Sequence, residues 1–237
     1  MSGFVTFAGL AVAFVATGIA LGIWKRATML RRAEFIGTYN WPPQLLEKLA
    51  KKYPHFKRKE SALVSKGLRQ FFTAYLKGGL KPVSMPSEVV DDLWHEFILY
   101  TRSYKEFCDK AFGQFLHHQP AVMLSPERRA SNEGLRRVWW QCCREENIDP
   151  NNPTRLPLLF ALDTKLNIPN GYRYVADCGG IRRDTGSSTA PNCAGDFSSS
   201  TIDGSTDGLG ESASGASDGG GSDGGGGDGG GCGGGGD

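Results

Sequence analysis

The chain has 237 residues and a formal net charge of +2, but charge and glycine are distributed very unevenly along it. Residues 179–237 hold 22 of its 33 glycines, together with nine acidic and only two basic residues. A basic body is therefore followed by an acidic, glycine-rich tail. Six cysteines are too few for a disulfide scaffold, and 39% hydrophobic residues support one modest globular domain rather than several.

The N-terminal segment is apolar. Residues 2–24 carry no charged side chain and would span roughly 34 Å as an α-helix, which is enough for the hydrocarbon core of a bilayer. We therefore predict a transmembrane anchor over residues 1–25 and a single-pass membrane protein. A cleaved signal peptide is the alternative, although the segment lacks a basic start and a clear cleavage site.

Basic residues follow the apolar segment directly. No charged side chain precedes it, so the positive-inside rule places the body and the C-terminus in the cytoplasm, with the inverted topology as the alternative. The residues on which this prediction depends are Lys25, Arg26, Arg31 and Arg32.

The expected partners follow from the same region. The lipid bilayer is the first, and basic residues between 51 and 59 favour anionic lipid near the anchor. The acidic tail can fold back on the basic body or contact a basic protein partner. Nucleic acid is not expected, because stacking aromatics are not interleaved with these basic residues. Gly18 and Gly22 form a small-xxx-small pair, which favours a homodimer through the predicted transmembrane helix.

Residues 26–178 show strong helical periodicity and predict a cytoplasmic helical domain of about six helices. Ser87 is the expected N-cap of the third helix, and Ser103 begins a capping box for the fourth, which Gly113 ends. Residues 172–175 predict a short extended piece. The expected helices cover residues 43–53, 61–77, 87–100, 103–113, 131–146 and 156–166.

Residues 179–237 contain almost no apolar side chains, so burial cannot offset the entropy of ordering the chain, and we predict a disordered tail. The predicted fold class is thus mainly α. It comprises a transmembrane helix, a small helical domain and a disordered glycine-rich tail.

Residues 91–120 hold three of the four histidines and are the place where the sequence predicts chemistry. Asp91 and His95 are four residues apart and share one flank of the third predicted helix. A carboxylate at this spacing can accept the imidazole N–H and orient the ring, as it does beside many metal-binding histidines. The same spacing also occurs in ordinary surface pairs.

Three further residues are candidate metal ligands. If the third and fourth helices form a hairpin, Cys108 and either His117 or His118 can converge on His95, with Asp91 beside them. Nitrogen, sulfur and carboxylate ligands suit zinc or another borderline metal, so zinc is the candidate cofactor. The competing interpretation is that Cys108 is a small buried hydrophobic residue. His95 does not open an H-E-x-x-H motif, which gives the zinc-protease mechanism no support.

The same stretch has a spacing of aromatic, histidine and cysteine residues over about 20 positions, carried by Trp94, His95, Leu99, Tyr104, Cys108, Phe112 and Gly113. This spacing resembles that of the glycine-rich domain-containing protein family, and the glycine-rich C-terminus agrees with it. Phe97 and Thr101 depart from the family pattern, which has a second histidine and a proline there. The resemblance implies a helical domain and no particular reaction.

Two functions are consistent with these patterns. The first is a membrane-anchored helical interaction or scaffold domain, because the sequence contains no recognised catalytic or nucleotide-binding motif. The alternative is a metal-binding enzyme or sensor domain that uses His95, Cys108 and His117 or His118, oriented by Asp91. The sequence assigns no catalytic residue, and whether the protein is an enzyme stays open.

Overall fold

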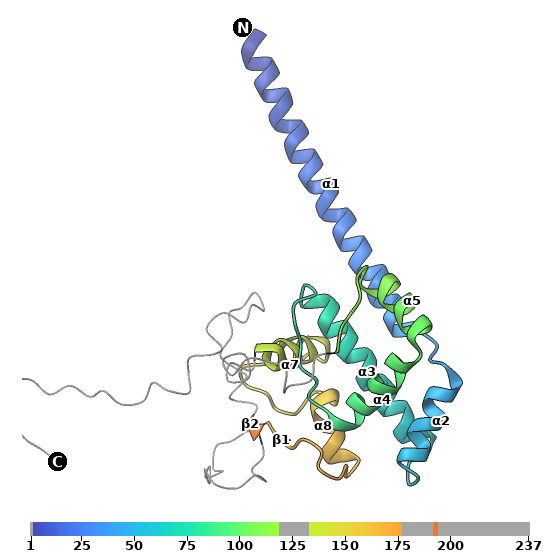
Figure 1. The fold of residues 1–237 in the computed structure, drawn as a ribbon. Coiled ribbons are helices and arrows are strands. Elements are labelled where there is room, and N and C mark those ends of the chain that lie inside the picture. Colours follow the sequence, from blue (N-terminus) through green and yellow to red (C-terminus); the bar gives the residue numbers. More distant parts are fainter. Residues whose placement is uncertain (1, 119–132, 177–191, 194–237) are drawn as a thin grey trace, which may run out of the picture.

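The computed structural model describes residues 2–118, 133–176 and 192–193, which form seven α-helices and one pair of short strands (Figure 1). The predicted mainly α fold class is confirmed for these residues. The elements are α1 (Ser2–Thr38), α2 (Pro43–Lys52), α3 (Arg58–Lys77), α4 (Glu88–Leu99), α5 (Thr101–Ala111), α7 (Glu133–Glu145), α8 (Leu158–Lys165), β1 (Tyr174–Val175) and β2 (Asn192–Cys193).

Helix α1 is a single long helix that stands out from the body (Figure 1). Among the described residues, none of the helices combines the length and the apolar character that crossing a bilayer demands. Lys25 and Arg26 follow Trp24 within the same helix, and charged side chains are costly in the hydrocarbon core of a bilayer. The predicted transmembrane anchor, the single-pass assignment and the membrane localisation are therefore wrong.

The last turns of α1 belong to the helical body, and they contact α3 and α5. Ile36 is fully buried, and the Phe35 ring packs against Phe107 of α5 with ring centroids 5.8 Å apart. Arg32 donates a hydrogen bond from Nη1 to the carbonyl oxygen of Phe112 at 2.9 Å. The helix thus continues well past the predicted anchor, and its C-terminal third is part of the core.

Helix α3 is the centre of the body and contacts α1, α2, α4, α7 and α8. Leu68, Phe71 and Phe72 are fully buried on it. A Cβ atom on Gly67 would lie 2.5 Å from Leu162 Cδ1 of α8 and 3.0 Å from Val90 Cγ2 of α4. The glycine therefore allows α4 and α8 to pack closely against α3, which brings the start of α4 next to α8.

Helices α4 and α5 follow each other with only Tyr100 between them. Ser87 caps α4 as predicted, because its Oγ accepts a hydrogen bond from the Val90 N–H at 3.4 Å. The predicted capping box at Ser103 is wrong, since α5 already begins at Thr101. Gly113 lies just beyond α5 with a φ of 74°, a conformation that favours glycine, and it ends this helix as predicted.

Strand β1 lies within the short extended piece predicted at residues 172–175 and pairs in parallel with β2. At Asn192 and Cys193 the chain is therefore extended and paired, in contrast to the predicted disorder. The rest of the predicted tail, residues 179–191 and 194–237, lies outside the described residues.

Candidate metal site

Helix α4 carries two of the site residues on one flank. Val90, Leu93 and Trp94 face the core, which leaves Asp91 and His95 at the edge of the helix. His95 Nδ1 lies 3.6 Å from Asp91 Oδ2, and the two side chains are 52% and 24% exposed. The predicted pair is thus present at the surface, within reach of a third group.

That third group is His118, from the segment that follows α5. Tyr104 Oη donates a hydrogen bond to the Leu116 carbonyl oxygen at 2.6 Å and accepts one from Trp94 Nε1 at 3.2 Å. The His118 ring packs edge-on against Trp94, with centroids 4.5 Å apart. Because Leu116 is buried beside these groups, the backbone two residues before His118 is fixed and the imidazole turns toward α4.

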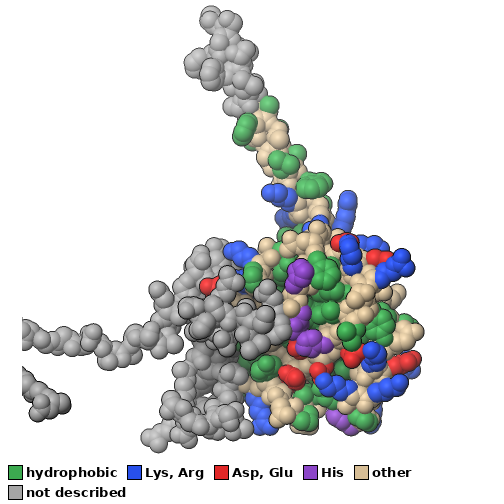
Figure 2. Space-filling view, in the orientation of Figure 1, with side chains coloured by type: hydrophobic (Ala, Val, Ile, Leu, Met, Phe, Trp, Pro, Cys, Tyr) green, Lys and Arg blue, Asp and Glu red, His purple; other side chains and the backbone are tan. Residues whose placement is uncertain are grey.

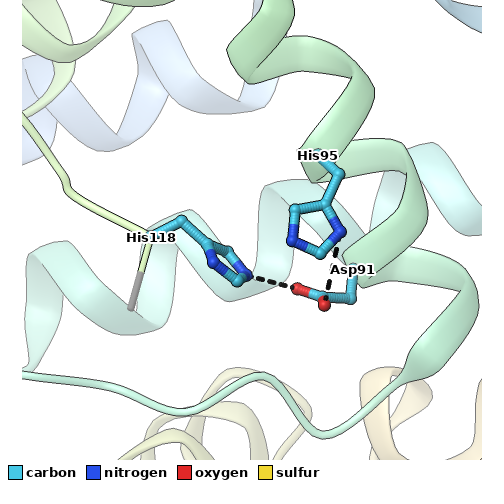
Figure 3. Close-up of side chains that lie close together, drawn as sticks. All are labelled: Asp91, His95 and His118. Atoms are coloured by element: carbon cyan, nitrogen blue, oxygen red, sulfur yellow. Dashed lines mark hydrogen bonds and ion pairs between the residues drawn. The ribbon is translucent and has the colours of Figure 1, made fainter. Parts of the chain in front are cut away.

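The three side chains meet in one cluster (Figure 3). His118 Nε2 lies 3.0 Å from Asp91 Oδ1, and the two imidazole rings have centroids 4.2 Å apart. One nitrogen or oxygen atom from each of Asp91, His95 and His118 lies within 4.8 Å of those of the other two. Ligands about 2.1 Å from a tetrahedral zinc ion lie roughly 3.4 Å apart, so small side-chain rotations would bring the three onto one ion.

Two of the five sequence candidates do not join this cluster. Cys108 is fully buried on the inner face of α5, where burial raises the pKa of its thiol against the opposing effect of hydrogen bonds with Leu116 and Tyr104. His117 is exposed and lies against Phe115, with ring centroids 4.7 Å apart. The structure therefore groups Asp91, His95 and His118 and places Cys108 and His117 elsewhere.

Acidic side chains lie near the histidines, with lysine and arginine side chains among them (Figure 2). Burial, followed by the negative charges of Asp92, Asp91 and Asp163, raises the pKa of Glu88, which lies one turn before Asp91 on α4. The pKa of the Tyr172 phenol is raised as well, first by burial and then by the negative charges of Glu88, Asp91 and Asp163. This negative potential favours a cation over an anion at the cluster.

Sequence reasoning missed one residue that supports the site. Asp163 is 3% exposed on α8, and its carboxylate binds the first residues of α4, which carries Asp91 and His95. The available signal was an aspartate that follows the apolar run 158–162 directly. An ionised side chain in such a setting is rarely buried unless it is paired or hydrogen-bonded.

A cluster of two imidazoles and one carboxylate can perform limited chemistry. It can hold a divalent metal of borderline hardness while leaving at least one coordination position for water or another ligand. Without an ion, the carboxylate can accept hydrogen bonds from both rings, as in an ordinary surface network. The nearby carboxylates and the convergence of three ligands on one point favour the first of these uses.

Comparison with curated proteins and with solved structures finds no match. The predicted resemblance to the glycine-rich domain-containing protein family is wrong, because the family model that matches is a different one. The resemblance rested on about 20 residues of α4 and α5 and on the glycine-rich end, most of which lies outside the matched range. The model described as UCP032817-like matches residues 31–197, which is more than half of the chain, and the protein therefore belongs to this uncharacterised family.

Proposed function

We propose that this protein binds a divalent metal ion of the zinc type through Asp91, His95 and His118. The observation that supports the proposal is the approach of these three groups to within 4.8 Å from two separate segments of the chain. His118 is 17% exposed, so the ion would lie partly sheltered against Trp94. This is the metal-binding alternative from the sequence, with a ligand set that excludes Cys108 and His117.

The ligand types narrow the choice of metal. Imidazole nitrogen suits zinc, copper, iron and nickel, and a carboxylate shifts the preference away from the soft ions that thiolates select. Three protein ligands leave a position for water, as in catalytic zinc sites, whereas structural zinc sites are usually closed by four. An ion held here can polarise an oxygen atom or activate water, which would suit a metal-dependent enzyme or a sensor.

Zinc titration of the full-length protein by calorimetry tests the proposal. We expect one ion per chain, and we expect His118→Ala or Asp91→Ala to weaken binding at least tenfold. His117→Ala is the matched control, because this neighbouring histidine is exposed and lies outside the cluster. Absence of zinc binding by the wild-type protein, or an equal loss in the His117 variant, would contradict the proposal.

A second candidate function is self-association through α1. Phe14, Ile19 and Ile23 are 85%, 58% and 65% exposed, and a Cβ on Gly18 or Gly22 would meet nothing within 4 Å. An exposed apolar surface of this kind is typical of protein interfaces. This retains the interaction role predicted from the sequence without its membrane anchor.

Analytical ultracentrifugation of the full chain tests this second candidate. A dimer that dissociates when Gly18 and Gly22 are both replaced by leucine would support it. A wild-type protein that is monomeric at micromolar concentration would contradict it.

A further inference from the structure

Asp163 is a buried carboxylate that binds two segments of the chain at once, residues 87–89 and Tyr172. It accepts hydrogen bonds from Ser87 Oγ at 2.7 Å and from the backbone N–H groups of Glu88 at 2.8 Å and Val89 at 3.3 Å. A fourth comes from the Tyr172 N–H at 2.9 Å. These four donors account for both carboxylate oxygens.

Three of these donors are the N-cap and the first two residues of α4. N–H groups in the first turn of a helix have no partner within the helix, and they carry partial positive charge that a carboxylate stabilises. The Asp91 N–H donates a hydrogen bond to the carbonyl oxygen of Ser87 at 2.9 Å. The candidate metal ligand Asp91 therefore lies one helical turn after Ser87, whose hydroxyl binds Asp163. The carboxylate therefore limits rotation and sliding of α4 just where it presents Asp91.

The surroundings leave Asp163 little freedom to move. A Cβ atom on Gly171 would lie 2.7 Å from Asp163 Cβ, so the backbone of residue 171 packs directly on this side chain. On the other side, Val89 and Val90 are fully buried. Since α4 contacts both α3 and α8, a displacement of Asp163 would be transmitted to α4.

The other half of the cluster is held by different contacts. His118 follows the segment fixed by Tyr104 and Leu116, which also contacts α4 through Trp94, and none of the described hydrogen bonds joins this segment to Asp163. The distance between the two imidazoles and the Asp91 carboxylate therefore depends on how α4 sits relative to that segment.

We propose that Asp163 is a positioning residue for the metal site. It fixes the position of α4 relative to the segment after α5, so that Asp91 and His95 lie close enough to His118 to bind one ion. This inference rests on the proposed metal-binding function. Outer residues that orient ligands typically change metal affinity by about 10- to 100-fold when they are replaced.

The variant Asp163→Asn tests the inference with almost no change in volume. Its amide can keep an oxygen toward Ser87 and Val89, but its NH2 group then faces the N–H donors of Glu88 and Tyr172. We expect the zinc dissociation constant of the full-length protein to rise at least about tenfold. We also expect the visible absorption bands of the cobalt(II)-loaded protein to shift, a change that lower stability alone would not produce.

Glu146→Gln is the matched control. Glu146 is likewise a carboxylate that accepts hydrogen bonds at the start of a helix, from the Leu158 N–H at 2.6 Å and from Gln70 Nε2 at 2.9 Å. These bonds hold α8 and α3, and the described part of the chain shows no hydrogen bond from Glu146 to α4. Its replacement should lower stability and leave the zinc affinity and the cobalt spectrum unchanged.

The outcomes separate this inference from the function on which it rests. If the wild type and Asp163→Asn bind zinc equally and share one cobalt spectrum, the inference is overturned and the metal site stands. Equal weakening by Glu146→Gln would also overturn it, because the effect would then be general. If the wild type binds no zinc, both fall. Should Asp163→Asn not fold, Ser87→Ala, which removes one donor to Asp163, decides by the same criteria.

Discussion

At the scale of single residues, His117 and His118 are neighbours, yet His118 joins Asp91 and His95 whereas His117 lies against Phe115. The Asp91–His95 pair could be predicted, because a spacing of four residues on a helix is local geometry. Nothing in the sequence distinguishes two adjacent histidines in a segment outside a helix. The structure separates them through Leu116, whose burial fixes the backbone so that His118 packs on Trp94.

Cys108 was predicted as a metal ligand from its residue type and its closeness to His95 in the sequence. Its position on the apolar face of α5 was predicted correctly, together with the alternative that it is a small buried hydrophobic residue. Only the packing of the described chain shows that its thiol is buried beside Tyr104 and Leu116, outside the cluster that contains His95. Residue type and closeness in the sequence therefore predicted five metal ligands, of which only three lie together in the described structure.

Tyr104 should be important for both stability and metal binding. Tyr104→Phe removes the donor to the Leu116 carbonyl oxygen and the acceptor for Trp94 Nε1, which leaves two buried polar groups without their partner. We expect a loss of about 1–3 kcal/mol in the free energy of unfolding, measured by urea denaturation. Zinc binding should weaken as well, because the segment before His118 loosens. Tyr100→Phe, at a partly exposed tyrosine, is the control, and an unchanged stability of Tyr104→Phe would contradict the account.

At the scale of elements, each of the six described helices between residues 43 and 166 corresponds to one predicted from apolar spacing and caps, in the same order. The start of α5 was misplaced because Tyr100 serves as the C-cap of α4 and the N-cap of α5 at once, which leaves no turn for a separate capping box. The length of α1 was underestimated for a related reason. Its charged residues after Trp24 suggested an end, whereas the burial of Ile36 keeps the helix continuous into the core.

The junction of α7 and α8 should be sensitive to acid. Burial alone would raise the pKa of Glu146, but hydrogen bonds from Gln70, Arg155 and the Leu158 N–H outweigh it and hold the pKa below 4.5. A lowered pKa in the folded state contributes stability above the unfolded pKa, and this stability is lost as the pH falls through the folded value.

Glu146→Gln should therefore destabilise the protein near pH 7, by about 1–3 kcal/mol, because hydrogen bonds to a charged group become neutral ones. The difference from the wild type should begin to shrink as the pH falls below about 4.5, where the carboxyl of the unfolded chain takes up a proton, and should be lost below the lower pKa of the folded state. Denaturation curves at a series of pH values from 7 downward measure both effects. A difference that stays constant or grows toward low pH would contradict this assignment.

Close packing of α3 against α4 and α8 makes a second prediction at this scale. Gly67→Val should lower the free energy of unfolding by about 1–3 kcal/mol, because new methyl groups would overlap Leu162 and Val90 in a packed core. Ala62→Val on the exposed face of α3 provides the matched control for helix propensity. Equal effects of the two substitutions on thermal unfolding would show that the glycine is not needed for packing.

At the scale of the whole molecule, the chain divides at about residue 30. The family match begins at residue 31, and from there the last turns of α1 pack on α3 and α5. The earlier part of α1 stands away from the body (Figure 1). Composition did not predict a boundary at residue 30, because the apolar segment that ends at Trp24 indicated a boundary at residue 25 instead.

Truncation tests this division. A chain that begins at Lys25 should unfold at nearly the same temperature as the full chain, since it keeps Arg32, Phe35 and Ile36. In a chain that begins at Tyr39, the free energy of unfolding should fall by about 3 kcal/mol or more, because this chain lacks the fully buried Ile36 and the packed Phe35. Thermal denaturation by circular dichroism measures both, and equal unfolding temperatures for the two truncated chains would contradict it.

The central claim is that one metal ion binds between α4 and the segment after α5, on two imidazoles and one carboxylate. X-ray absorption at the zinc edge, on the full-length protein loaded with one equivalent, tests it most directly. The account predicts nitrogen and oxygen neighbours at about 2.0–2.2 Å and no sulfur, with the imidazole signal reduced in His118→Ala and kept in His117→Ala. A sulfur neighbour at about 2.3 Å, or the reverse pattern in the two variants, would contradict it.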